Sequence, residues 1–99
     1  MKAPELSVLV ISFNTRNLTL SCIEGFYDDA TAAGWEVIVV DNGSSDGTAD
    51  AVADRFPAAR VVRSQRNLGY AGGSNLGLRM ARGEVIVLLN SDVFVPPQV

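Results

Sequence analysis

The sequence contains no histidine, and this absence excludes several kinds of site. Catalytic groups of the Ser-His-Asp and Cys-His types need an imidazole as general base, and many zinc sites use histidine as a ligand. There is also only one cysteine, Cys22, so an intrachain disulfide is excluded. Cys22 falls at an apolar position of a predicted helix, where we interpret it as a small buried side chain. A chain without disulfides favours a reducing compartment.

Long apolar runs and clusters of basic residues are missing as well. A transmembrane helix needs about 20 apolar residues in succession, and no run approaches that length. The first 14 residues place a lysine before a short apolar core but lack the small-residue cleavage site of a signal peptide, so we interpret them as leading into a strand. The net charge of −3 and the pI of about 4.7 argue against nucleic acid or an anionic membrane as the main partner.

The residues that are present predict one α/β domain spanning residues 1–99, because 47% of them are hydrophobic and suffice for a single core. Short aliphatic runs predict strands over residues 6–13, 35–40, 60–63 and 85–89. These runs do not alternate with polar residues, which indicates strands buried on both faces of a parallel sheet, the last strand included. Helices are predicted between the strands, so the expected order is β-α-β-α-β-α-β.

Three details of the helices follow from the sequence. An apolar stripe from residue 18 to residue 30 predicts one helix, capped by Thr15 or Asn17 and ending at Gly34. A helix beginning near residue 48 is expected to be capped by Ser44 or Ser45. Residues 64–73 are polar and glycine-rich and lead into a third helix that ends near residue 81. Gly73 and Gly77 give this helix a flat face, which indicates close packing on the sheet or contact with a ligand.

Polar residues follow the buried strands, and the topology decides whether they meet. If the strand order begins 3-2-1-4, as in doubly wound, Rossmann-like sheets, the first and fourth strands flank the switch point where such sheets bind ligands. Asn14, Asp41 and Asp92 then lie along one edge of the sheet, and residues 69–75 cross near it. We therefore predict the binding site at this edge.

Two carboxylates at such an edge suit a nucleotide with a metal-bound diphosphate. Asp41 can accept hydrogen bonds from a base N–H or a ribose hydroxyl. Asp92 can hold a hard divalent cation, which neutralises charge on a departing diphosphate. Phe13 either packs against the base or belongs to the core, and Arg63 and Arg66 either reach phosphate or are solvated.

Other nucleotide-binding folds fail on local sequence. The turn after the first strand reads SFNTRN, without the glycines of the G-x-G-x-x-G dinucleotide motif. The P-loop pattern G-x-x-x-x-G-K-S/T is absent from the whole sequence. The same turn also lacks the glycine-rich basic loop of nucleotidyltransferases and the acidic pair of response-regulator receivers.

Four segments together resemble a known family. They are SVLVISFN (7–14), VIVVDNGSSDGT (37–48), NLGYAGGSNLGL (67–78) and GEVIVLLNSD (83–92). In this order and spacing they resemble the N-terminal, donor-binding half of a family 2 glycosyltransferase, of the kind that includes rhamnosyltransferase-like enzymes. The resemblance covers essentially the whole chain. It implies a partial GT-A fold and the transfer of a sugar, with inversion, from a nucleoside-diphosphate sugar to an acceptor hydroxyl.

The resemblance also implies which residues form the site. The residues expected at the donor nucleotide are Ser12, Phe13, Asn14, Asp41, Gly69, Gly73 and Asn75. Asn90, Ser91 and Asp92 stand where the family has its D-x-D metal motif, so Asp92 is the expected ligand of magnesium or manganese, with Asn90 as the second candidate. The catalytic base of the family lies beyond this stretch and is not assigned here.

Further expectations concern the whole protein. The chain looks truncated before the acceptor-binding half, so we expect an enzyme fragment that is inactive alone and binds a UDP- or dTDP-linked sugar. The uncovered edge of its fourth strand is expected to pair with another copy. The expected place of action is the cytoplasm or the inner face of the plasma membrane, in cell-surface polysaccharide biosynthesis. The alternative is a non-catalytic nucleotide-binding or interaction module.

Overall fold

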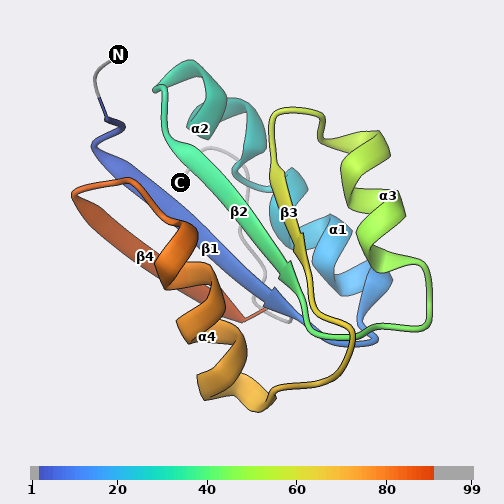
Figure 1. Cartoon of the computed structure of the whole chain (residues 1–99). Coiled ribbons are helices and arrows are strands. Elements are labelled where there is room, and N and C mark those ends of the chain that lie inside the picture. Colours follow the sequence, from blue (N-terminus) through green and yellow to red (C-terminus); the bar gives the residue numbers. More distant parts are fainter. Residues whose placement is uncertain (1–2, 91–99) are drawn as a thin grey trace.

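The computed structural model describes residues 3–90, which form a four-stranded parallel sheet with helices on both faces (Figure 1). In chain order the elements are β1 (Leu6–Ser12), α1 (Arg16–Glu24), α2 (Tyr27–Ala32), β2 (Glu36–Asp41), α3 (Thr48–Arg55), β3 (Arg60–Arg63), α4 (Gly69–Met80) and β4 (Val85–Asn90). The strand order is β3-β2-β1-β4, and each neighbouring pair is parallel. The predicted fold class and strand order are confirmed.

The core has two layers, one on each face of the sheet. On the face of α1 and α3, the core cluster contains Val10, Val39 and Val52. On the face of α4, it contains Leu9 and Ile38, with Leu76 of α4 packed against it. Successive residues of a strand point to opposite faces, so a strand covered on both sides must be apolar at every position. This explains the unbroken aliphatic runs of β1 and β2.

The two glycines of α4 allow this helix to lie close to β1. A Cβ atom added at Gly77 would come within 2.8 Å of Leu9 Cδ2, and one added at Gly73 would come within 3.2 Å of Ile11 Cγ2. Both distances are shorter than an ordinary carbon–carbon contact. The flat face of α4 therefore packs on the sheet, which is one of the two roles that the sequence left open.

The predicted helix over residues 18–30 is wrong as a single element. The chain breaks after Gly25 into α1 and α2, and Phe26 packs partly buried against the core cluster of α1 and α3. Cys22 and Ile23 are buried as expected, but Leu18 is 51% exposed. The periodicity continues across the break because both short helices turn their apolar residues toward the same layer.

Two helix starts also differ from the prediction. Asp46, rather than Ser44 or Ser45, receives the backbone N–H of Thr48 at the beginning of α3. Helix α4 begins at Gly69, inside the segment that was expected to be irregular. Gly69 has a φ of +76°, a left-handed conformation that suits glycine and lets the chain turn directly into the helix.

The prediction that the fourth strand is buried on both faces is also wrong. Val85 is 58% exposed, and the next three residues of β4 are more than a third exposed. β4 pairs with β1 on one side, and within residues 3–90 no strand pairs with its other side. β4 thus has the edge position that the predicted strand order gives it, but the covering of both its faces that its aliphatic sequence indicated is incomplete.

A buried carboxylate holds the beginning of β4 at the amino edge of the sheet. Glu36 accepts hydrogen bonds from the Ser7 hydroxyl (2.8 Å) and the Arg82 backbone N–H (2.8 Å). Ser7 Oγ in turn accepts the N–H of Gly83 at 2.9 Å. Burial raises the pKa of Glu36, and the hydrogen bonds from Arg82 and Ser7 outweigh it, leaving this pKa below its usual value. The bonds fix the connection from α4 to β4 on the two central strands.

Candidate functional site

The carboxyl ends of three neighbouring strands lie at the same level. Ser12 of β1 is in register with Asp41 of β2, and Ile11 of β1 is in register with Asn90 of β4. Because the chain runs outward from β1 to β3 and then returns to the other side for β4, the strand order reverses between β1 and β4. In open α/β sheets, ligands bind at the carboxyl edge of such a reversal. The loops after β1, β2 and β3 gather there (Figure 1).

Asn14 and Asp41 are joined by the turn that follows β2. The N–H of Asn14 donates to Ser44 Oγ at 2.9 Å, and the N–H of Ser45 donates to Asn14 Oδ1 at 2.8 Å. Asp41 is 5% exposed, and its Oδ1 accepts the N–H of Ser44 at 2.9 Å. The structure therefore brings Asn14 and Asp41 to one edge. Asp92, the third residue expected there, lies outside the described residues.

Asp46 of the same turn binds the first turns of two helices. Its Oδ2 accepts the N–H of Arg16, which begins α1, at 3.0 Å. Its Oδ1 accepts the N–H of Thr48, which begins α3, at 3.1 Å and also the Thr48 hydroxyl. The hydrogen bond from the Thr48 hydroxyl is the largest effect on the pKa of Asp46 and lowers it. Burial comes second and raises this pKa, but the backbone N–H groups of Arg16 and Thr48 add to the lowering, so the pKa stays below its usual value.

The remaining predicted residues occupy different positions. Ser12 is fully buried, and its hydroxyl lies 2.8 Å from the Thr19 hydroxyl, so it faces α1. Gly69 begins α4, and Gly73 is buried between this helix and the sheet. Asn75 is exposed on α4.

A hollow of about 450 Å³ opens between these elements; we call it the rim hollow. Its walls are uncharged, and the lining residues are Ile11, Phe13, Thr15, Leu18, Asn42, Asn67, Gly69, Tyr70 and Asn90. Phe13 and Tyr70 present exposed rings, 42% and 51% accessible, while Asn67 and Asn90 supply amide donors and acceptors. Such walls suit a flat, uncharged ring that needs stacking and a few hydrogen bonds.

A second hollow, of about 520 Å³, lies at the opposite edge of the sheet, around Trp35, Glu36 and Arg82. It is slightly larger than the rim hollow. Because parallel sheets bind ligands at their carboxyl edge, we assign the functional site to the rim hollow in spite of this difference in size.

Sequence reasoning missed several residues of the rim hollow. Thr15 and Leu18 come from the beginning of α1, and Asn67 and Tyr70 from the beginning of α4. Asn42 directly follows Asp41, and strand alternation would have placed its side chain on the other face of the sheet. Tyr70 could have been recognised as a candidate because it is an aromatic residue within a glycine-rich segment.

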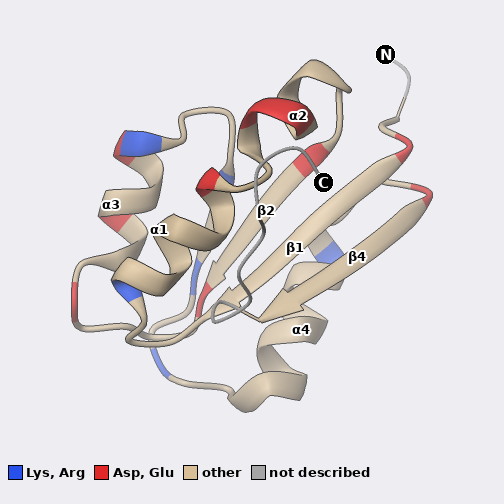
Figure 2. Cartoon of the chain, turned by 180° about the vertical axis from the view of Figure 1, so that it is seen from behind, with Lys and Arg blue, Asp and Glu red and all other residues tan. Residues whose placement is uncertain are grey.

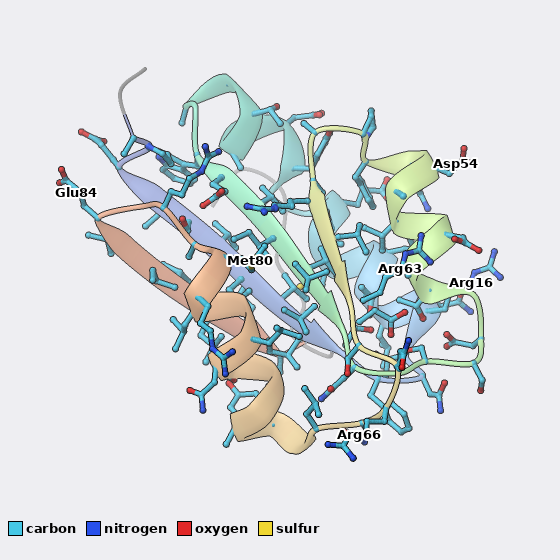
Figure 3. All side chains as sticks on the ribbon, viewed as in Figure 1. Arg16, Asp54, Arg63, Arg66, Met80 and Glu84 are labelled. Carbon is cyan, nitrogen blue, oxygen red and sulfur yellow. The ribbon has the colours of Figure 1, made fainter. Side chains whose placement is uncertain are left out.

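The arginines near this edge stay outside the rim hollow. Arg63 forms an exposed ion pair with Asp50 at 2.8 Å, so this guanidinium already has a partner. Arg66 points away from the sheet, as the side chains in Figure 3 show. Among residues 3–90 no group of three or more acidic, cysteine or histidine side chains could hold a metal ion.

Comparison with known sequences identifies the same family that the four sequence segments resemble. The sequence model described as "Glycosyl transferase family 2" matches residues 7–99. The succinoglycan biosynthesis protein ExoO of Rhizobium meliloti is 34% identical over 97 residues, which are 97% of this chain and 28% of that protein. The chain thus spans less than a third of the length of this curated relative.

Solved structures resemble the chain in the same region. The mannosyltransferase PcManGT of Pyrobaculum calidifontis, in complex with GDP-Man and Mn²⁺, superposes with a TM-score of 0.81 and 32% identity, covering 95% of this chain and 29% of that one. TarS 1-349 of S. aureus, in complex with UDP, superposes with a TM-score of 0.79 and 27% identity, covering 89% and 27%.

Proposed function

The chain belongs to glycosyl transferase family 2, and from this premise we propose that it is the donor-binding part of an inverting glycosyltransferase. The observation that carries the proposal is the rim hollow, which opens at the switch point of the sheet between Phe13 and Tyr70. The substrate class is a nucleoside-diphosphate sugar. In support, two proteins of similar structure were solved with such ligands, PcManGT with GDP-Man and TarS with UDP.

The nucleoside is assigned to the rim hollow. A nucleobase has two apolar faces and a polar edge, which suits walls made of Phe13, Tyr70 and asparagine amides. Asn14 and Asp41 hold the adjoining turn, and Asn75 borders the donor from α4. We propose a UDP- or dTDP-linked sugar as the donor.

A divalent cation, magnesium or manganese, is proposed at the end of β4. Asn90 lines the rim hollow and has an amide oxygen, and Asp92, two residues further along the sequence, adds a carboxylate. Hard cations prefer oxygen ligands of these kinds, so the two residues fit such an ion. When bound, the cation neutralises charge on the diphosphate.

The proposed reaction exchanges one bond for another. An acceptor hydroxyl oxygen attacks the anomeric carbon from the side opposite the diphosphate, and the bond from that carbon to the diphosphate oxygen breaks. The hydroxyl proton passes to a general base, and the nucleoside diphosphate leaves. No residue of this chain is assigned as the base, so we propose that the chain alone binds the donor without transferring the sugar.

The whole protein is proposed to act on a cell-surface polysaccharide, in the cytoplasm or at the inner face of the plasma membrane. The relative ExoO carries the name of a polysaccharide biosynthesis protein, which supports this class of product. Within residues 3–90 no helix is long and apolar enough to cross a bilayer. Cell fractionation tests the location, and recovery from the outer surface would contradict it.

A melting experiment tests donor binding. We expect UDP or dTDP with Mg²⁺ or Mn²⁺ to raise the Tm of the chain, because a ligand at 100 times its Kd adds about 2.7 kcal/mol of stability. Asp92→Ala should remove the part of this shift that requires the cation. Asp54→Ala, an exposed change on α3, serves as the control and should leave the shift intact.

Two outcomes would contradict the proposal. If no nucleoside diphosphate changes the Tm, with or without a cation, the chain is an interaction module rather than a donor-binding part. If the isolated chain releases nucleoside diphosphate from a donor sugar only when an acceptor is present, it contains a complete catalytic site after all.

A further inference from the structure

Asn42 is the first residue after β2, and its side chain bridges to the loop that precedes α4. It is 2% exposed, although it lines the rim hollow. Its Oδ1 accepts the backbone N–H of Leu68 at 2.9 Å, and its Nδ2 donates to the carbonyl oxygen of Gly69 at 3.0 Å. The amide therefore uses its oxygen and its nitrogen on backbone groups of two neighbouring residues in one loop.

The surroundings of Asn42 leave little room for another arrangement. A Cβ atom added at Gly73, the fifth residue of α4, would lie 2.9 Å from Asn42 Nδ2, so the beginning of this helix packs closely on the amide. A Cβ atom added at Gly43, whose φ is +88°, would lie 2.8 Å from the carbonyl carbon of Arg66 and 2.9 Å from Asn67 N. Two glycines thus allow the loop to approach the end of β2 closely.

A further hydrogen bond extends this attachment toward β3. The N–H of Ser64, the first residue after β3, donates to the carbonyl oxygen of Asp41 at 2.9 Å. Residues 64–69 are therefore attached to the end of β2 at their beginning, by the close approach to Gly43 in their middle, and by Asn42 at their end. This loop and the turn that follows it carry Asn67, Gly69 and Tyr70, which form one wall of the rim hollow.

We propose that Asn42 is a positioning residue of the donor site, which holds the wall formed by Asn67, Gly69 and Tyr70 in the shape that receives the nucleoside. This inference rests on the proposed function. Asparagine fits because its amide matches one N–H and one C=O group. Alanine would leave the Leu68 N–H without its partner, and aspartate would set a carboxylate oxygen against the Gly69 carbonyl oxygen.

Direct contact with the ligand is the competing role for Asn42. The near-complete burial of its side chain and the use of both its polar atoms argue against it. The two roles differ in the absence of ligand, because only a positioning residue changes the loop of the unliganded chain. If Asn42 orders the loop before the ligand arrives, binding no longer includes the entropy loss of ordering that loop.

Amide hydrogen exchange of the chain without nucleotide separates these roles. In Asn42→Ala we expect the Leu68 amide to exchange roughly threefold to tenfold faster, a factor that corresponds to the net strength of one hydrogen bond. Amides in the centres of β1 and β2 should keep their rates. Asn17→Ala, which removes an exposed amide from α1, is the matched control and should change neither set. An unchanged rate at Leu68 would overturn the proposal.

Calorimetric titration with UDP and with dTDP, each with Mn²⁺, then measures the consequence for binding. Asn42→Ala should raise the Kd about tenfold with a less favourable entropy. Asn42→Asp, which has the same shape and keeps the acceptor for Leu68, should retain protection at Leu68 and still raise the Kd severalfold. If Asn42→Ala does not fold, this second variant tests whether Asn42 matters for binding, and an unchanged Kd would then contradict the proposal.

The remaining outcomes are also decisive. If Asn42→Ala loses binding while the Leu68 amide stays protected, Asn42 contacts the ligand directly and the positioning role is wrong. If the unaltered chain binds neither nucleotide, the proposed function fails for both, whereas the exchange rate at Leu68 still decides whether Asn42 holds the loop.

Discussion

At the scale of single residues, the site depends on short polar side chains that bind backbone groups. Asn14, Asn42 and Asp46 each accept a backbone N–H from another segment of the chain. The sequence predicted that polar residues would gather after the strands, because turns favour asparagine, aspartate and serine. It did not predict their partners, since a partner 25 or more residues away depends on how the loops pack.

Ser12 and Asn42 illustrate the limit of residue-scale prediction. Ser12 shares a face of β1 with Val10, whose cluster lies against α1 and α3, and its hydroxyl binds Thr19 of α1. Asn42 follows Val40 on the face of α4, which is why it reaches the loop before that helix. The alternation of side chains along a strand predicts which face of the sheet each residue lies on. This works for Ser12 and Asn42 only if the end of each strand is known to within one residue.

Asp46 provides a prediction at this scale. Asp46→Asn should lower the free energy of unfolding at pH 7 by about 1 kcal/mol, because it removes a negative charge that accepts backbone N–H groups at the start of two helices. The loss is modest because solvent screens the interaction between this charge and the N–H groups. The pKa of Asp46 is lowered in the folded chain, so its contribution is complete above the ordinary value of 3.8 and disappears as the pH falls through the folded pKa.

Urea unfolding at pH 7 and at pH 3 checks this expectation. The difference between the unaltered chain and Asp46→Asn should be smaller at pH 3 than at pH 7. Asp54→Asn, an exposed change on α3, is the control. A difference that stays constant or grows toward acid pH would show that the charge of Asp46 does not stabilise the helices.

At the scale of elements, the strands were predicted more accurately than the helices. The strand β3 has the predicted bounds, and the others differ by one residue at one or both ends, because aliphatic runs bounded by polar turns leave little choice. The helix over residues 18–30 was wrong because Gly25 and Phe26 interrupt it without disturbing the apolar spacing. The early start of α4 was missed because three glycines in its first five residues indicated a loop.

The glycine face of α4 gives a prediction at the element scale. Gly77→Ala should gain up to about 1 kcal/mol from helix propensity and lose about 1–3 kcal/mol from overpacking against the fully buried Leu9. We therefore expect a net loss of stability in thermal unfolding. Asn75→Ala, on the exposed side of the same helix, measures the propensity gain alone. A Gly77→Ala chain more stable than the Asn75→Ala chain would contradict the close packing.

At the scale of the whole molecule, the topology was predictable because alternating strands and helices allow few arrangements. The free edge of β4 was expected as well, but the exposure of its faces was not, since its sequence is that of a covered strand. β4 carries no charged side chain between Val85 and Asn90 (Figure 2), so its free edge lacks the charges that usually oppose pairing between sheets. We propose that two copies of this chain associate through β4.

Sedimentation velocity tests this association. The chain should sediment increasingly as a dimer at higher concentration, and Val87→Lys should shift it toward the monomer because a lysine at the edge opposes strand pairing. Ala53→Lys, which adds the same charge on α3 at the other side of the sheet, should not. A strictly monomeric chain at high concentration would contradict the proposal.

The turn after β2 has one further consequence. It is bonded on one side to the beginning of α1, through Asn14 and Arg16, and on the other to the loop before α4, through Leu68 and Gly69. Neither neighbouring loop can move away without breaking bonds to this turn. Within the described residues, a displacement of any one of these three loops would break hydrogen bonds to another, so we expect them to move together.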